Sequence, residues 1–87
     1  MQNPETMSYM MNDLTQYIMM PKIRYDPGIG TYVSYDIAEY DCFKRDIMTI
    51  VWDVTSDRDL ALRMCDRFNR YQLSPIQLED AILDMIE

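Results

Sequence analysis

Apolar residues near the start of the chain recur every three or four positions, a spacing typical of one face of an α-helix. This stripe consists of Met7, Met10, Met11, Leu14 and Ile18. Asn3 followed by Pro4 is a strong helix start, because a proline at the first helical position has no N–H to leave unsatisfied. Pro21 is expected to end the helix. The pattern therefore predicts a Met-rich N-terminal helix within residues 1–21.

Polar and apolar positions alternate more closely in residues 22–54, which predicts antiparallel strands. A short strand over residues 22–26 leads into a turn, since Pro27 presets φ and Gly28 supplies positive φ. A longer strand is expected over residues 31–41, and a third, rich in branched residues, over residues 47–54 after a polar connection. In this third strand the expected core face carries Met48, Ile50, Trp52 and Val54.

The last third of the chain predicts two helices joined by a tight corner. Ser56 and Asp59 have capping-box spacing for a helix ending near Tyr71, and Ser74 with Gln77 has the same spacing for the next one. The expected fold class is α+β in a single domain of residues 1–87. Its parts are an N-terminal helix (1–21), a small antiparallel sheet of two to three strands (22–54) and a C-terminal helical hairpin (56–87).

Charge narrows the possible partners. Fifteen acidic residues against eight basic ones give a net charge of −7, and a field of that sign repels phosphate backbones and anionic membranes. The final helix carries Glu79, Asp80, Asp84 and Glu87, and no Lys or Arg follows Arg70. The corner is therefore not expected to read duplex DNA in the manner of a helix-turn-helix.

Catalytic and metal-binding patterns are missing from the sequence. The chain has no histidine, and Cys42 and Cys65 stand apart, so neither zinc spacing nor a nucleophile–base pair occurs. We therefore expect a non-enzymatic protein without a cofactor. Whether the two cysteines pair stays open. The acidic start and the absence of an 18-residue apolar run predict a cytoplasmic protein without a membrane segment.

Three groups of residues are candidates for partner binding. The acidic cluster of Glu79, Asp80, Asp84 and Glu87 suits a protein with a basic surface. Met10, Met11 and Tyr17 extend the apolar surface of the first helix, for a partner or for a homodimer. Tyr32 and Tyr35 place aromatic rings on the sheet, where they suit a protein or, as an alternative, single-stranded nucleic acid.

Three motifs carry a resemblance to a known family: YDPGIGTYVSYDI (25–37), WDVTSDRD (52–59) and LSPIQLEDAI (73–82). Together they resemble a family of small bacterial proteins of unknown function, over roughly residues 23–86 and without the Met-rich start. The motifs are turns and caps, so the resemblance implies a strand hairpin and a two-helix corner but no activity. Gln77 stands where the family is expected to have a histidine.

The expected function is that of a non-catalytic protein-binding module. A more specific hypothesis is that the module is an inhibitor. The spacing of the acidic side chains on the last helix would imitate the spacing of phosphates, so that the helix occupies the basic channel of a host defence protein that handles nucleic acid. Some small acidic proteins of mobile elements act in this way, so a phage or mobile-element protein is the expected type. Two alternatives remain, a homodimer formed through the first helix and a weak binder of single-stranded nucleic acid.

Overall fold

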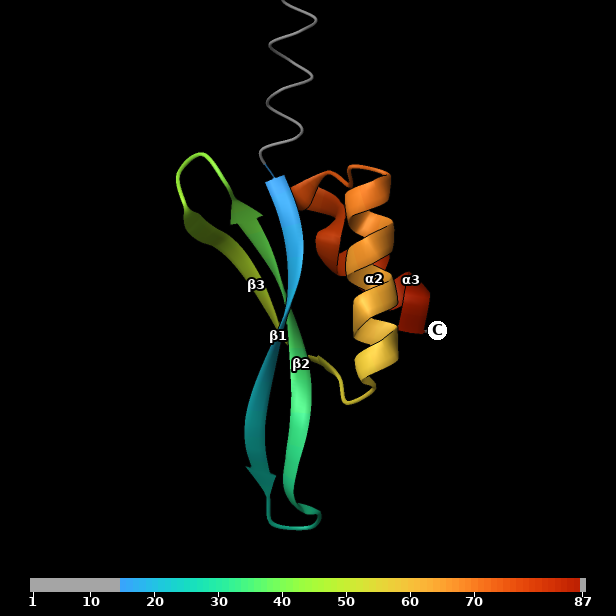
Figure 1. The fold of residues 1–87 in the computed structure, drawn as a ribbon. Coiled ribbons are helices and arrows are strands. Elements are labelled where there is room, and N and C mark those ends of the chain that lie inside the picture. The colour runs from blue at the N-terminus through green and yellow to red at the C-terminus, as the bar shows by residue number, and fades with distance from the viewer. Residues whose placement is uncertain (1–14, 87) are drawn as a thin grey trace, which may run out of the picture.

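The computed structural model describes residues 15–86, which form an antiparallel sheet followed by two helices (Figure 1). The elements in chain order are β1 (Thr15–Asp26), β2 (Gly30–Asp41), β3 (Asp46–Thr55), α2 (Arg58–Arg70), the 3₁₀ turn η1 (Pro75–Gln77) and α3 (Leu78–Ile86). The strand order is β1-β2-β3. The α+β class, the antiparallel sheet and the C-terminal pair of helices are confirmed.

The predicted N-terminal helix is wrong from Thr15 to Pro21, because these residues belong to β1. The strand pairs with β2 without interruption, from Thr15 opposite Asp41 to Asp26 opposite Gly30. Pro21 is tolerated because β1 is an edge strand and a missing N–H on the outer edge breaks no ladder bond. The rest of the predicted helix lies outside the described residues.

The two faces of β3 differ from the prediction because its pairing with β2 is irregular. Register shifts occur between Tyr35 and Ile37 and between Glu39 and Tyr40, and Asp53 has a left-handed backbone with φ of 54°. Val54 packs against the core as predicted, but Val51, expected on the other face, packs there as well. Met48 and Trp52, expected on the core face, are 46% and 56% exposed.

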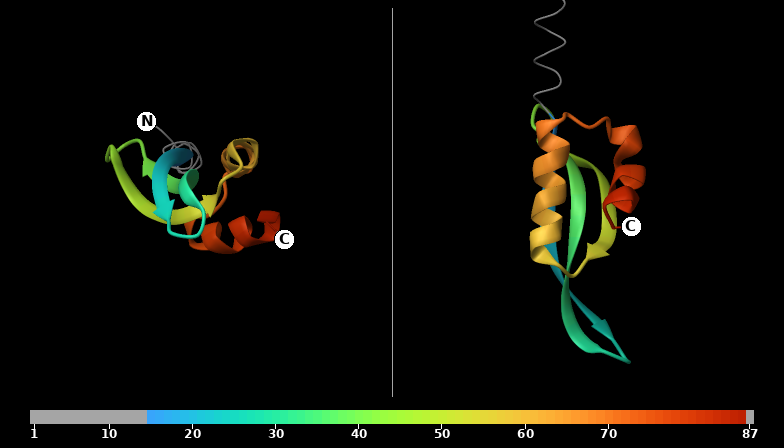
Figure 2. Two further views of the ribbon diagram at one scale, coloured as in Figure 1. Left: turned by 90° about the horizontal axis from the view of Figure 1, so that it is seen from below. Right: turned by 90° about the vertical axis from the view of Figure 1, so that its right-hand side faces the viewer.

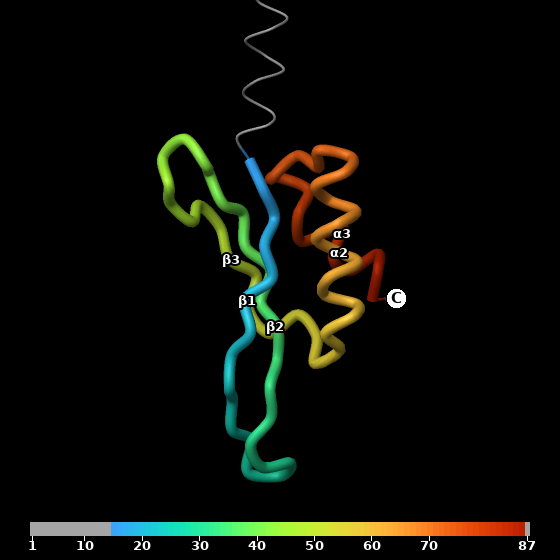
Figure 3. Tube along the Cα trace, in the orientation of Figure 1, coloured from blue at the N-terminus to red at the C-terminus, as the bar shows by residue number. Residues whose placement is uncertain are grey.

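The hairpin of β1 and β2 extends well beyond the third strand. β3 pairs only with the part of β2 from Tyr35 to Asp41, so residues 22–34 form a two-stranded arm that projects away from the helices (Figure 3). The turn at its tip forms where it was predicted, but the glycine with positive φ is Gly30, at 97°, and not Gly28. Ile29 donates its N–H to the carbonyl of Asp26 at 3.1 Å, and the Asp26 carboxylate accepts from Gly28 N at 2.7 Å.

The hydrophobic core lies between one face of the sheet and the two helices, which both cover that face (Figure 2). Its buried members are Tyr17, Ile37, Ala61, Met64, Cys65, Phe68, Leu78 and Ile82. The ring of Tyr17 meets Phe68 edge-on at 5.8 Å. An amphipathic α2 thus supplies four of the eight, and α3 adds two from one side of the helix.

Two hydrogen bonds fasten the end of α2 to the outer edge of β1. Asn69 accepts from Tyr17 N at 2.7 Å through its side-chain oxygen, and its amide nitrogen donates to the Tyr17 carbonyl at 2.9 Å. The side chain thereby occupies backbone groups that an edge strand otherwise leaves unpaired.

The helix starts are close to those predicted, with one change of cap. Asp57, not Ser56, precedes α2 and accepts the N–H of Leu60 at 3.2 Å. Ser74 and Pro75 begin the second helical segment as expected, but as a 3₁₀ turn without a side-chain cap bond. Leu78, the first residue of α3, is buried in the core.

Candidate functional site

The exposed side of α3 combines acidic and apolar side chains. Glu79, Asp80 and Asp84 are all exposed, and so are Leu83 and Ile86. With 3.6 residues per turn, Asp80 and Asp84 lie one above the other on one side of the helix, and Glu79 and Leu83 on another. No basic residue occurs between positions 71 and 86. This helix therefore presents three acidic side chains, without a basic residue of its own, next to exposed hydrocarbon.

A groove separates α3 from α2. Its volume is about 520 Å³, and its lining consists of Arg67, Phe68, Tyr71, Leu73, Ala81, Asp84 and Met85. Most of these side chains are apolar, with one charged group from each helix. An apolar cleft with a few polar groups is the usual form of a recognition site. We refer to this groove together with Glu79, Asp80 and Asp84 as the α3 surface.

The other predicted site residues do not join the α3 surface. Met10, Met11 and Glu87 lie outside the described residues. Tyr32 is half-buried on the arm, and its Cα is paired with that of Arg24. Tyr35 points to the opposite face of the sheet and packs against the core. The two tyrosines therefore form no common aromatic platform.

Tyr17 requires a correction, because it lies in the core and offers no surface to a partner. Its side chain is 3% exposed, and its hydroxyl donates to the carbonyl of Leu73 at 2.5 Å. Burial, and secondarily the nearby Glu39, raise the pKa of Tyr17 to about 12. The residue therefore joins β1 to the corner between the helices.

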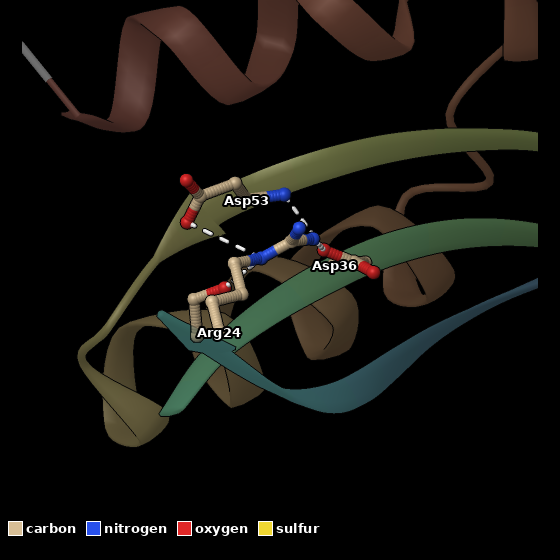
Figure 4. Close-up of polar contacts among 4 residues, drawn as sticks. Arg24, Asp36 and Asp53 are labelled. Carbon is tan, nitrogen blue, oxygen red and sulfur yellow. Dashed lines mark hydrogen bonds and ion pairs between the residues drawn. The ribbon is translucent and has the colours of Figure 1, made fainter. Parts of the chain in front are cut away.

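A polar cluster that the sequence analysis did not single out lies on the other face of the sheet, at the root of the arm (Figure 4). Arg24 donates to Ser34 Oγ at 2.7 Å and to Asp36 Oδ1 at 2.8 Å. The same Asp36 oxygen accepts Asp53 N at 2.6 Å, and Asp53 Oδ1 lies 3.8 Å from Arg24 Nε. The carboxylate of Asp36 therefore joins all three strands.

This cluster is built for stability. Asp36 is 2% exposed at its side chain, and burial of a carboxylate is costly unless charged and hydrogen-bonding partners surround it. Its bond to the N–H of Asp53 also holds that residue in its left-handed conformation, which asparagine and aspartate tolerate better than most residues. One sequence feature could have predicted this cluster. Ser34 and Asp36 are polar residues on the same face of the predicted strand, the face opposite Ile37.

Both cysteines are free thiols, which answers the question of their pairing. Cys65 is buried in α2, and burial raises the pKa of its thiol to about 11. Cys42 is half-buried in the turn between β2 and β3. Only a thiolate reacts rapidly with a disulfide reagent, so protonation and burial both protect Cys65.

We expect the native protein to react with one equivalent of Ellman's reagent at neutral pH, through Cys42, and with a second equivalent only after unfolding in urea. The variant Cys42→Ser should then show no fast reaction, and Cys65→Ser should keep it. Two equally fast thiols in the native protein would contradict the buried position of Cys65.

The described part of the chain was also searched for metal sites and for membrane-spanning helices. Within residues 15–86, no three side chains of His, Cys, Asp or Glu lie close enough to hold a metal ion. No helix in the same range has the length and apolar character needed to cross a membrane.

Comparisons of the chain with protein-family models, with curated proteins and with solved structures found no match. The resemblance to a family of small bacterial proteins therefore rests on its three motifs and stays a prediction.

Proposed function

We propose that the protein is a non-catalytic binding module that presents the α3 surface to a protein partner with basic side chains. The observation that carries the proposal is the exposure of Glu79, Asp80 and Asp84 beside an apolar groove, with no basic residue on the same helix. Electrostatic complementarity provides steering and selectivity, and the groove provides the apolar contact that retains the partner.

The charge distribution within the molecule supports the choice of α3. The basic residues of α2 have acidic residues on their own helix, and Asp66 pairs with Arg70 at 3.0 Å. The three acids described on α3 have no ion pair within the described chain. A partner's Lys or Arg side chains can therefore approach them without displacing an internal pair.

The groove supports the proposal in a different way. Phe68, Leu73 and Met85 line it, and one of the three, Met85, has a flexible thioether side chain that adapts to different shapes. Interfaces depend on a few apolar anchors seated in pockets, with polar groups around them. A single aromatic or long aliphatic side chain of the partner fits this description.

The finer form of the proposal concerns the identity of the partner. A basic surface that accepts this acidic helix is typical of a protein that handles nucleic acid, so the module would act as an inhibitor by occupying that surface. The free thiols agree with a reducing compartment. We therefore place the proposed action in the cytoplasm.

The test compares two double variants with the same change in net charge. The tagged protein, its Asp80→Lys/Asp84→Lys variant and its Asp59→Lys/Asp66→Lys variant are used to capture proteins from a nuclease-treated bacterial lysate. We expect the unmodified protein and the α2 variant to retain the same basic protein. The α3 variant should lose it at least tenfold, since two attractive carboxylates are replaced by two positive charges that repel the basic partner.

Circular dichroism must show that both variants keep their helices, so that loss of binding is not loss of fold. The captured protein is then purified, and its binding should weaken as salt is raised and compete with a DNA oligonucleotide. Equal capture by the α3 variant would refute the role of the acids. Capture of no protein besides the bait would refute the binding module itself.

A further inference from the structure

The two outer strands of the sheet differ in how their free edges are protected. Along β1, Asn69 occupies the backbone groups of Tyr17, and Pro21 has no N–H to offer. Along β3, residues 47–52 carry no charge and no proline, and no further strand of residues 15–86 lies beside it. Charged residues and prolines are the usual means of keeping another strand from an edge. The edge of β3 is therefore the one that accepts a further strand.

The exposed apolar residues of β3 lie on both sides of Ile50. Met48 is 46% exposed and Trp52 is 56% exposed, and because side chains alternate along a strand, these two share the face of Ile50. That face is opposite the helices, since Ile50 pairs with Ala38 and not with the core residue Ile37. Ala38 is fully buried at the centre of this face, so the uncovered apolar residues lie at its margin. A strand beside β3, and not a layer stacked on the face, fits that distribution.

We propose that β3 pairs with β3 of a second copy of the chain, in antiparallel orientation, with the two Ile50 residues opposite each other. A two-fold axis perpendicular to the sheet produces this arrangement, in which both copies use the same patch. The result is a continuous six-stranded sheet with both pairs of helices on one side. In Figure 1 the first part of β3 and the turn before it lie on the side of the sheet away from α2 and α3, so the helices leave this edge free.

A register centred on Ile50 brings the exposed apolar residues together. Each Met48 then lies opposite Trp52 of the second copy, and the contact occurs twice. Methionine sulfur attracts aromatic rings, and such cross-strand pairs are the main source of stability in a sheet. A register centred on Thr49 would instead place Trp52 opposite the charged Asp46. The exposed residues thus favour one register over its neighbour.

The irregular positions of β3 fit the same register. The strand pairs regularly with β2 from Thr49 to Val51 and has a register shift on each side of this stretch. Such shifts bend a strand and increase its twist. In the proposed register the shift at Met48 faces the one beyond Val51 of the second copy. Each bent part of β3 therefore meets another bent part, and the two regular stretches pair with each other.

Charge complementarity also supports this register. The turn before β3 carries Lys44 and Arg45, both of which are exposed. In the proposed dimer this turn lies beside the end of β3 in the second copy, where the exposed Asp57 follows. Within the paired strands Asp46 faces the apolar Val54, so no like charges oppose each other there. Opposite charges near the two ends of the interface favour the antiparallel orientation.

The mass in solution tests the proposal. Light scattering at micromolar to millimolar concentrations should show a reversible change from one chain mass to two, without larger species. Met48→Glu places a charge on the apolar margin at β3, and Ile23→Glu makes the same change at a residue of the arm that is 75% exposed. We expect Met48→Glu to weaken dimerisation at least tenfold and Ile23→Glu to leave it unchanged. Circular dichroism must show that both variants keep their fold.

Disulfide formation tests the register independently of the charge variants. In a Cys42→Ser background, Ile50→Cys places two thiols opposite each other across the two-fold axis, within the Cα separation of about 4.4–6.8 Å that a disulfide spans. Thr49→Cys is the control, because each thiol then lies opposite Val51 and is too far from its counterpart. We expect mild oxidation to link the Ile50→Cys chains and to leave the Thr49→Cys chains single.

Three results would overturn the proposal. A single chain mass at every concentration would show that the edge of β3 belongs to another protein's strand or to none. Equal dimerisation of the Met48→Glu and Ile23→Glu variants would place the contact between copies elsewhere on the molecule. Linkage of the Thr49→Cys chains in place of the Ile50→Cys chains would show that the strands pair in a different register.

Discussion

Replacing Asp36 with alanine should lower the free energy of unfolding by about 3–5 kcal/mol, the usual cost of removing one partner from a buried ion pair. The substitution leaves the Arg24 guanidinium without its closest carboxylate. It also removes the acceptor for the N–H of Asp53, which then has no support for its left-handed backbone. Urea unfolding followed by the helical circular dichroism signal measures the change.

Asp66→Ala is the matched control for this prediction. Asp66 also pairs with an arginine, at 3.0 Å, but the two side chains are 65–68% exposed. An exposed pair of this kind contributes about 0–1 kcal/mol. Similar losses in the two variants would mean that the polar cluster is solvated in solution and does not bind the three strands together.

Phe68→Ala should also lower the free energy of unfolding by about 3–5 kcal/mol, because it removes a large buried ring and leaves a cavity. The ring is 4% exposed and makes edge-on contact with Tyr17 between α2 and β1. A loss of this size is a large share of the stability of a domain with 87 residues. Urea unfolding measures it, with thermal unfolding as a second check.

The protein's other phenylalanine provides the comparison. Phe43 lies in the turn between β2 and β3 and is 78% exposed, so Phe43→Ala should change the free energy of unfolding by about 0.5 kcal/mol or less. A larger effect of Phe43→Ala would indicate that the turn is covered in solution, by another copy or by residues outside the described range.

Elements with strong local signals were predicted well from the sequence. The turn at Pro27 and Gly28, the strands on either side of Phe43 and the two C-terminal helices all lie within a few residues of their expected positions. Each depends on turn residues, caps or a helical apolar stripe, which act over a few neighbouring positions. The exposed position of the acidic residues on α3 was also predictable, because it follows from the helical pattern of apolar and polar residues.

β1 was not predictable in this way. Leu14 and Ile18 continue a helical spacing, and a following proline normally ends a helix. Yet Tyr17 and Met19 point to the core while Ile18 lies on the other face, so the strand is apolar on both sides and shows no clear alternation. Pairing with all of β2 decides its conformation, and the partners of residues 15–21 lie 14 to 26 positions later in the chain, beyond the reach of a local pattern.

The faces of β3 and the groove depend on geometry that no local pattern contains. One register shift lies between Ile47 and Thr49, and the other, with the left-handed backbone at Asp53, lies between Val51 and Thr55. Such bulges reverse a simple alternation of side chains. The groove arises from the separation of α2 and α3, which the corner at Leu73 sets. The sequence therefore predicted which residues lie on each helix, but it did not predict the groove between the two helices.

The bonds between Asn69 and the backbone of Tyr17 have a consequence for how copies of the protein behave when crowded. An open strand edge is a template on which another molecule's strand can add, and repeated addition leads to fibres. Here the outer edge of β1 is occupied at Tyr17 by a side-chain amide, and Pro21 offers no donor at a second position. An incoming strand meets an interrupted ladder, so the protein itself limits the growth of its sheet on this side.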